Sequence, residues 1–227
     1  MKAPKIATLI LATLTTLAFG LGCGADEPPP EPPRPDPAAY VWPAGPNPTA
    51  VLEIDGMGEI EIELYPSLAP STVKNFSKLA TNGFYAGTTF HRVIPDYMIQ
   101  GGDPNSKDDD PSDDGRGGPG WNIQDEFSDA PHVRGVLAMA NLGSSNTGSS
   151  QFFIVQKDAP SLDGKHAIFG RVTRGMEIVD AIAAVETDTY GRWGPANRPL
   201  ANVVINDIAI HQPAEREATI AAIESDV

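Results

Sequence analysis

Cysteine is nearly absent from this chain of 227 residues, because Cys23 is its only one. A single thiol cannot form a disulfide within the chain, so a buried core has to hold the fold. Positive charge is also scarce: 16 lysines and arginines face 30 aspartates and glutamates, and the formal net charge is −14. Such an acidic surface repels phosphate backbones and anionic lipid headgroups, so we expect no nucleic-acid partner.

Long apolar runs are lacking outside the N-terminal region. Lys2 and Lys5 precede an apolar stretch at residues 6–22 that contains small residues and four threonines. A basic start followed by a short apolar region is typical of a secretory signal peptide, and the stretch is short for a membrane-spanning helix. We therefore expect a signal peptide at residues 1–22, with a transmembrane anchor as the alternative.

Cys23 directly follows this region, in Gly20-Leu21-Gly22-Cys23. Its position resembles that of the lipid-modified cysteine in bacterial lipoproteins, although those signals usually have leucine where Gly20 stands and a small residue where Leu21 stands. We expect lipidation of Cys23 and anchoring of the mature chain to a membrane of the cell envelope, on its periplasmic or extracytoplasmic side. The alternative is an unmodified cysteine near an ordinary cleavage site.

Proline is concentrated after this cysteine, since ten of the chain's 22 prolines lie at residues 26–48, among acidic residues. Such a composition cannot bury a core and favours extended conformers. We expect residues 23–48 to form a linker that holds a domain at residues 49–211 away from the membrane. A proline-rich ligand for a partner domain is the alternative. Residues 212–227 form a polar tail.

Periodicity within the domain favours a mainly β fold. Isoleucine and leucine alternate with glutamate at residues 59–64, which predicts a half-buried strand that pairs with residues 50–54 in a hairpin. Helical spacing of apolar residues predicts helices over residues 73–80, before Gly83, and over residues 176–183. Further strands are expected at 89–94, 97–100, 136–140, 152–155, 167–172 and 203–210. This pattern allows a closed antiparallel barrel or an α+β sandwich.

The segment most informative about function is FHRVIPDYMIQGGD at residues 90–103. Three shorter segments follow in order: MAN at 139–141, GSSQFFI at 148–154 and LDGKHAIFG at 162–170. Together these segments resemble the cyclophilin-type peptidyl-prolyl isomerases. The resemblance implies a closed eight-stranded antiparallel β-barrel capped by two α-helices, and an enzyme that needs no cofactor and no metal.

Rotation about the peptide bond before proline requires neither a nucleophile nor a redox group. Its barrier of about 18–20 kcal/mol comes from amide resonance. A hydrogen-bond donor aimed at the twisting amide and an apolar pocket for the proline ring lower this barrier. Arg92 suits the donor role, because its guanidinium is permanently charged and planar. The resemblance implies that Arg92 is the main catalytic residue, that Gln100 orients it, and that His166 completes the catalytic set.

The resemblance also implies the residues that bind substrate. The main chain around Asn141 is similar to the strand edge to which a substrate peptide adds. Tyr97 departs from the family, which usually has phenylalanine there. The substrate-binding set is Tyr97, Met98, Met139, Ala140, Asn141, Gln151, Phe153 and Leu162. For the apolar members the alternative is plain core packing, and for His166 it is a structural turn histidine; we expect His91 to be structural.

Three further features depart from the family. Ser161 occupies the place where cyclosporin-sensitive members have tryptophan, and Leu142 stands where a smaller alanine is common. Residues 107–114 form an acidic insertion with five carboxylates in seven residues, which we interpret as a solvated loop, with a Ca²⁺ site as the alternative.

The sequence therefore predicts an exported, membrane-anchored, monomeric prolyl isomerase that acts on proline-containing polypeptides and assists the folding of exported proteins. One alternative is a binding or chaperone module that uses the same groove without turnover. Another is a metal-responsive regulatory protein built on the acidic insertion.

Overall fold

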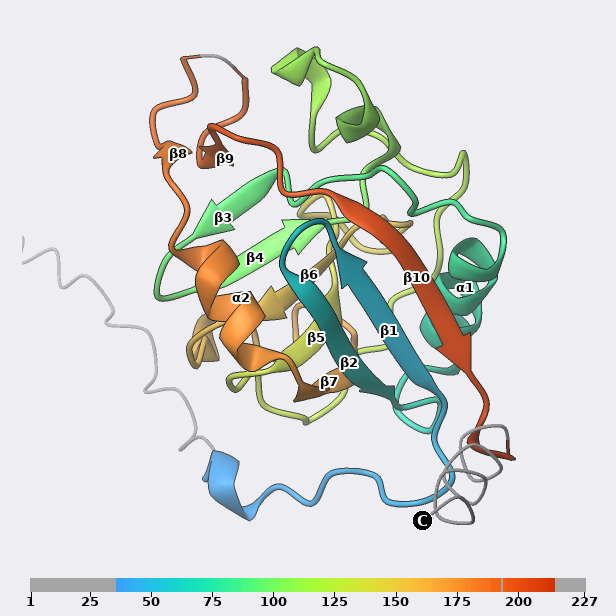
Figure 1. Ribbon diagram of the computed structural model, residues 1–227. Helices are drawn as coiled ribbons and strands as arrows, with labels where there is room; N and C mark the ends of the chain where they lie inside the picture. Colours follow the sequence, from blue (N-terminus) through green and yellow to red (C-terminus); the bar gives the residue numbers. More distant parts are fainter. Residues whose placement is uncertain (1–35, 193, 215–227) are drawn as a thin grey trace, which may run out of the picture. The chain divides into compact units, whose positions relative to one another are not determined.

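The computed structural model describes residues 36–192 and 194–214 (Figure 1). Several expectations fall outside these residues: the signal peptide, lipidation of Cys23, the first part of the linker and most of the polar tail. None of the helices within the described ranges is long and apolar enough to cross a membrane.

Eight strands form one sheet in the order β10-β1-β2-β7-β5-β6-β4-β3, and every neighbouring pair is antiparallel. Each strand lies where the sequence pattern placed one, so this part of the prediction is confirmed. A separate hairpin of two short strands, β8 and β9, was not anticipated. The bounds are β1 Thr49–Ile54, β2 Gly58–Leu64, β3 Arg92–Ile94, β4 Met98–Gly101, β5 Val136–Met139, β6 Phe152–Val155, β7 Ile168–Arg174, β8 Thr187–Asp188, β9 Arg198–Pro199 and β10 Ile205–His211.

The sheet is open, so the expectation of a closed barrel is wrong in this respect. β10 and β3 form its two edges, and the segments that lead into them, residues 87–90 and 203–205, are joined by three backbone hydrogen bonds around an isolated bridge between Thr89 and Val204. The cause is local: the backbone N–H of Val93 in β3 donates to the carbonyl of Asn197 at 2.8 Å, in the loop before β9. This loop therefore occupies the edge of β3 that a closing strand would need.

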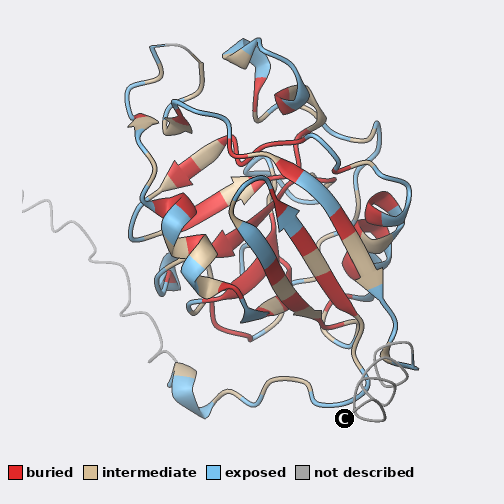
Figure 2. Ribbon diagram, viewed as in Figure 1, coloured by how far each residue is buried: buried red, intermediate tan, exposed pale blue. Residues whose placement is uncertain are grey.

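The core lies between the sheet and both helices. Helix α1 (Pro70–Thr81) packs beside β10, and α2 (Met176–Ala183), whose Val179 and Ile182 belong to the same core, packs near β2, β3 and β4 (Figure 1). Phe76 of α1 is fully buried, and its ring lies 5.6 Å from that of Phe152 and 5.2 Å from that of Phe169. Figure 2 shows buried residues on the strands and on the inner face of α1. Both helices match the segments that helical periodicity predicted.

The helix ends follow from local chemistry. Ser71 and Thr72 donate their backbone N–H groups to the Glu126 carboxylate at 3.0 and 2.8 Å. Burial raises the pKa of this carboxyl, but the hydrogen bonds outweigh burial, so the net pKa is lowered. Gly175, which precedes α2, has φ of 92°, and a side chain there would meet the carbonyl of Glu59 at 2.5 Å, so only glycine fits.

A second apolar cluster lies under the catalytic residues predicted from the sequence; its buried members include Met98, Phe153 and Ile168. The described end of the expected linker packs against it. The Trp42 ring stacks on that of Tyr65 at 5.8 Å, and the Arg171 guanidinium lies 5.2 Å from the Trp42 ring. Four short 3-10 helices complete the described chain: η1 Pro37–Ala39, η2 Pro104–Lys107, η3 Pro111–Asp113 and η4 Pro160–Leu162.

Candidate active site

Arg92 and Gln100 stand opposite each other on neighbouring strands, at the start of β3 and near the end of β4. The turn between these strands places Asp96 at φ of 57°, which keeps the two strands in register. Arg92 Nη1 donates to Gln100 Oε1 at 3.3 Å. The structure therefore brings the two predicted catalytic residues into direct contact.

Gln151 continues this contact into a relay of side-chain amides. Gln100 Nε2 donates to Gln151 Oε1 at 2.9 Å, and Gln151 Nε2 donates to the carbonyl of Gly117 at 2.9 Å. Each amide uses its oxygen as acceptor and its nitrogen as donor, so the orientation of each is fixed by its neighbours. The relay holds the Arg92 guanidinium in place while leaving its remaining N–H groups available as donors.

The apolar residues predicted to hold the proline ring gather beside this relay. Phe153 of β6 lies opposite Gln100 in the strand register, and Met98 belongs to the same strand as Gln100. Met98 and Phe153 are 3% and 4% exposed, whereas Tyr97 and Leu162 are half-buried and pack on the same cluster. Met98 and Phe153 thus belong to the core as well as to the site, so the core-packing alternative applies to them in part.

His166 stands edge-on to the Phe153 ring, with the ring centroids 5.1 Å apart. Its Nδ1 lies 3.1 Å from the carbonyl oxygen of Met139, a distance that requires Nδ1 to carry the donated proton. Burial lowers the pKa of this imidazole despite that contact and the nearby Asp125 carboxylate. His166 is therefore neutral at pH 7, with Nε2 left as an acceptor.

Asn141 follows β5, after Met139 and Ala140. Its Nδ2 donates to the carbonyl of Lys165 at 2.9 Å, and its Oδ1 accepts from the backbone N–H of Gly143 at 3.1 Å. These bonds tie the side chain into the neighbouring loops. The main chain is then the part of Asn141 that is suited to pair with a peptide.

Asn141 lines three hollows that hold the predicted catalytic residues, and we call these three hollows together the groove. The first, of about 380 Å³, is lined by Gln100, Ala140 and Gln151; the second, of about 540 Å³, by Arg92 and Gln100. The third, of about 300 Å³, is lined by His166. Every catalytic residue predicted from the sequence therefore faces this groove.

Trp121 also belongs to the site and His132 packs beneath it, although the sequence analysis missed both. Trp121 lines the first hollow, is 45% exposed, and donates its Nε1–H to Asn75 Oδ1 at 2.9 Å. The buried His132 ring stacks on Phe153 at 6.1 Å, with its Nδ1 3.0 Å from Asp163 Oδ1. The sequence offers one signal for each residue. Trp121 lies in a glycine-rich segment, and His132 is one of only four histidines in the chain.

The remaining expectations concern residues around the groove. His91 is buried beside Arg92, as expected of a structural residue, and burial lowers its pKa despite the nearby Asp103 and Asp114 carboxylates. Ser161 is exposed at η4, and Leu142 is 71% exposed. Among the described residues, no group of three or more acidic, histidine or cysteine side chains is arranged to hold a metal ion.

Comparison with known proteins identifies the family. The family model described as cyclophilin type peptidyl-prolyl cis-trans isomerase/CLD matches residues 49–210, which includes the whole groove. The chain belongs to this family. It is a cyclophilin-type peptidyl-prolyl cis-trans isomerase.

Similar cyclophilins come from distant organisms. Peptidyl-prolyl cis-trans isomerase B of Bacillus subtilis is 48% identical over 131 residues, which cover 57% of this chain and 86% of that protein. Peptidyl-prolyl cis-trans isomerase-like 1 of Mus musculus is 45% identical over 152 residues, or 64% and 85% of the two chains. Peptidyl-prolyl cis-trans isomerase-like 2 of Gibberella zeae is 46% identical over 160 residues; the match covers 68% of this chain but only 25% of that protein.

Solved structures show the same fold. A cyclophilin type peptidyl-prolyl cis-trans isomerase of Cryptosporidium parvum superposes with a TM-score of 0.64 at 32% identity, covering 73% of this chain and 98% of its own. A second structure of that protein, in the presence of the dipeptide Ala-Pro, gives a TM-score of 0.63 at 32% identity and covers 72% and 99%. The mainly β cyclophilin fold with two helices is thereby confirmed.

Proposed function

We propose that Arg92 catalyses isomerisation in this cyclophilin by donating a hydrogen bond to the proline nitrogen as the amide twists. Loss of resonance makes that nitrogen pyramidal and more basic, so a fixed cationic donor stabilises the twisted state more than the planar one. The observation that carries the proposal is the relay from Arg92 through Gln100 and Gln151 to Gly117, which holds the guanidinium against the largest of the three hollows.

The proline ring binds, in this proposal, against Phe153, Met98, Leu162 and Tyr97, while the main chain at Asn141 pairs with the substrate backbone. His166 acts by position rather than by proton transfer. Its lowered pKa keeps it neutral, and its contact with the Met139 carbonyl keeps the ring edge-on to Phe153. The substrates are proline-containing polypeptides, in keeping with the Ala-Pro dipeptide used with the Cryptosporidium parvum relative.

Turnover can be separated from mere binding by exchange NMR on an Ala-Ala-Pro-Phe peptide. A catalytic amount of the protein should produce exchange between the cis and trans resonances on a timescale far shorter than the uncatalysed tens of seconds. Shifted resonances without exchange would instead favour the binding or chaperone module. The Arg92→Ala variant, described in the Discussion, tests which residue is responsible.

We further propose that the protein is exported, is anchored by a lipid on Cys23, and assists the folding of exported proteins. The support is the apolar stretch that ends at the only cysteine and the proline-rich segment that follows it. A spacer of this composition is extended and semi-rigid, which suits a catalyst that must reach chains near a membrane surface.

Replacing Cys23 by alanine tests the anchor. In a bacterial host, Cys23→Ala should move the protein from the membrane fraction to the soluble fraction and should abolish labelling by a palmitate analogue, because one thiol carries the lipid. Isomerase activity per molecule serves as the control and should stay unchanged. Equal labelling of both forms would contradict the proposal.

A further inference from the structure

Two loops meet beside Arg92, at the hollow of about 540 Å³. The acidic loop, residues 104–117, connects β4 to the segment before β5 and includes η2 and η3. The β8–β9 loop, of which residues 189–192 and 194–197 are described, lies within the small hairpin. Both project at the same end of the sheet, above β3 (Figure 1). They are in van der Waals contact, because a side chain at Gly194 would lie only 2.7 Å from the carbonyl oxygen of Pro111.

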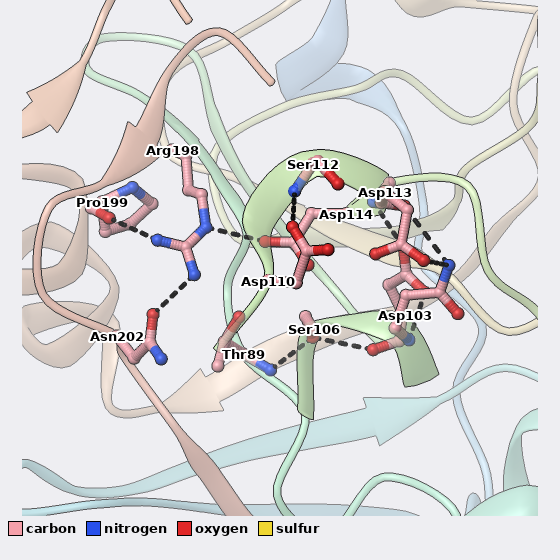
Figure 3. A network of polar contacts seen from close by, with 12 residues as sticks. Thr89, Asp103, Ser106, Asp110, Ser112, Asp113, Asp114, Arg198, Pro199 and Asn202 are labelled. Carbon is pink, nitrogen blue, oxygen red and sulfur yellow. Dashed lines mark hydrogen bonds and ion pairs between the residues drawn. The ribbon is translucent and has the colours of Figure 1, made fainter. Parts of the chain in front are cut away.

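The acidic loop is a folded element fixed at its base. The Asp103 carboxylate is fully buried and accepts backbone N–H groups from Asn105 at 2.8 Å, from Gly117 at 3.2 Å, and from Gly115. Ser106 Oγ donates to the carbonyl of Asp103 at 2.7 Å and accepts the backbone N–H of Thr89 at 2.9 Å (Figure 3). Buried, charge-assisted bonds of this kind define one loop conformation.

An ion pair joins the acidic loop to the β8–β9 hairpin. Arg198 Nε, at the start of β9, donates to Asp114 Oδ2 at 2.7 Å, and the two side chains are only 15% and 1% exposed (Figure 3). Arg198 Nη2 donates in addition to Asn202 Oδ1 at 2.9 Å. Because a desolvated charge pair tolerates few geometries, this contact fixes the acidic loop relative to the hairpin.

The joined loops form the outer wall of the hollow of about 540 Å³ that contains Arg92, Gln100 and Asn141. The wall is lined by Ser112, Asp114, Gly115, Arg116, Gly194 and Pro195. Asp114 belongs to this lining, although its Oδ1 atom is buried without a hydrogen-bond partner among the described residues. The hollow thus gives a substrate chain that pairs with the main chain at Asn141 and passes Arg92 a path along these loops.

We propose that Asp114 and Arg198 are positioning residues that determine substrate specificity: by holding the two loops as one wall, they set the affinity for extended polypeptide on the flank of the proline. The proposal rests on the isomerase activity of the family and not on the identity of the catalytic residue. Long unfolded segments gain contacts with the wall, whereas a peptide that covers only the proline pocket does not. The residues that select among substrates are thus those of the wall, and not those that contact the isomerising proline bond.

The test compares two peptides with the same Ala-Ala-Pro-Phe core, one of four residues and one of twelve with flanks at both ends. Exchange NMR with the full chain gives kcat and KM for each peptide. The readout is the kcat/KM value of the twelve-residue peptide divided by that of the four-residue peptide. Arg198→Ala should lower this ratio about tenfold through a higher KM for the long peptide, since a displaced wall loses its contacts. Arg198→Lys, which keeps the cation, should restore part of it.

Two further variants keep the proposal falsifiable. Ser112→Trp fills the hollow from an exposed position without touching the ion pair, and it should also lower the ratio. Arg174→Ala, which breaks an exposed ion pair with Glu61 on the sheet, is the matched control and should leave the ratio unchanged. A ratio unaffected by both Arg198→Ala and Ser112→Trp in folded protein overturns the proposal. An equal loss for the two peptides overturns it as well.

Discussion

One wall of the groove around Arg92 consists of paired strands, whereas the opposite wall consists of two loops held by an ion pair. In the strand wall, Gln100 and Phe153 stand in register on β4 and β6, and the Phe153 ring is also part of an apolar cluster. In the loop wall, Ser112 and Arg116 are exposed, and the stabilising contact is the Asp114–Arg198 pair. The difference shows how one groove can combine a fixed chemical centre with an adjustable outer surface.

The physical consequence is a division of roles. Residues of the strand wall cannot change without disturbing the core, because their packing partners lie underneath them. Residues of the loop wall can change in number and type, since surface loops tolerate insertion at small entropic cost. We therefore expect stability and turnover to depend on the strand wall, and the choice of substrate to depend on the loops.

The largest effect is expected from removing the aromatic ring of the strand wall. Phe153→Ala should lower the free energy of unfolding by about 3–5 kcal/mol, because the buried ring leaves a cavity. Phe127→Ala, in a loop where the ring is 45% exposed, should cost less than about 0.5 kcal/mol. Urea unfolding followed by circular dichroism measures both. Similar losses for the two variants would contradict the claim that the strand wall, unlike an exposed loop, carries stability.

Breaking the amide relay should affect turnover with less effect on stability. Gln151→Ala releases Gln100 from its acceptor and should lower kcat about tenfold with a small change in KM, since a misplaced Arg92 no longer meets the twisting amide. Gln156→Ala, just after β6 and bonded to Asp180 away from the groove, is the control. If the two variants have the same kcat, the relay does not position Arg92.

The smallest effect is a dependence of stability on pH. Burial lowers the pKa of His91, next to the loop wall, and of His166, next to the strand wall, below the ordinary 6.5. Around and below pH 6.5 the unfolded chain therefore binds more protons than the folded chain. The contribution of the two neutral imidazoles to the free energy of unfolding is complete above that pH and is lost as the pH falls. Each group contributes a slope of at most about 1.4 kcal/mol per pH unit.

Melting temperatures between pH 7 and pH 5 test this dependence. Replacing His91 by glutamine should reduce the dependence of the melting temperature on pH. Glutamine cannot take up a proton, so the protonation of the buried imidazole near Asp103 and Asp114 no longer favours the unfolded chain. A slope that is the same in the His91 variant would show that its protonation is not linked to folding.

Much of the strand wall was predictable from the sequence because it depends on local patterns. The segment at residues 90–103 has two short apolar runs on either side of a turn at Pro95-Asp96, which predicts both strands, and the family resemblance implied that Gln100 orients Arg92, its partner in the strand register. Helical spacing placed α2 correctly for the same reason. These features need only the neighbouring residues.

The loop wall and the open sheet were not predictable in this way. Asp114 and Arg198 are 84 positions apart, and β8 and β9 have two residues each, too few for a periodic pattern. Composition alone also marked residues 23–48 as a linker, whereas Trp42 stacks on Tyr65 and packs on the domain. Long-range contacts between a few residues decide these features, and one sequence carries no signal for them.

The most direct test of the account is the turnover of Arg92→Ala, measured by exchange NMR on the four-residue Ala-Ala-Pro-Phe peptide. Removing one fixed electrostatic donor typically costs about 10²–10³ in rate, so kcat/KM should fall by that factor. Arg92→Lys should recover only part of it, because an ammonium lacks the planar fork. The half-buried Arg92 side chain lies at the groove, so the circular dichroism spectrum and melting temperature should match those of the unmodified protein. A folded Arg92→Ala protein that isomerises the peptide at the unmodified rate would contradict the central claim.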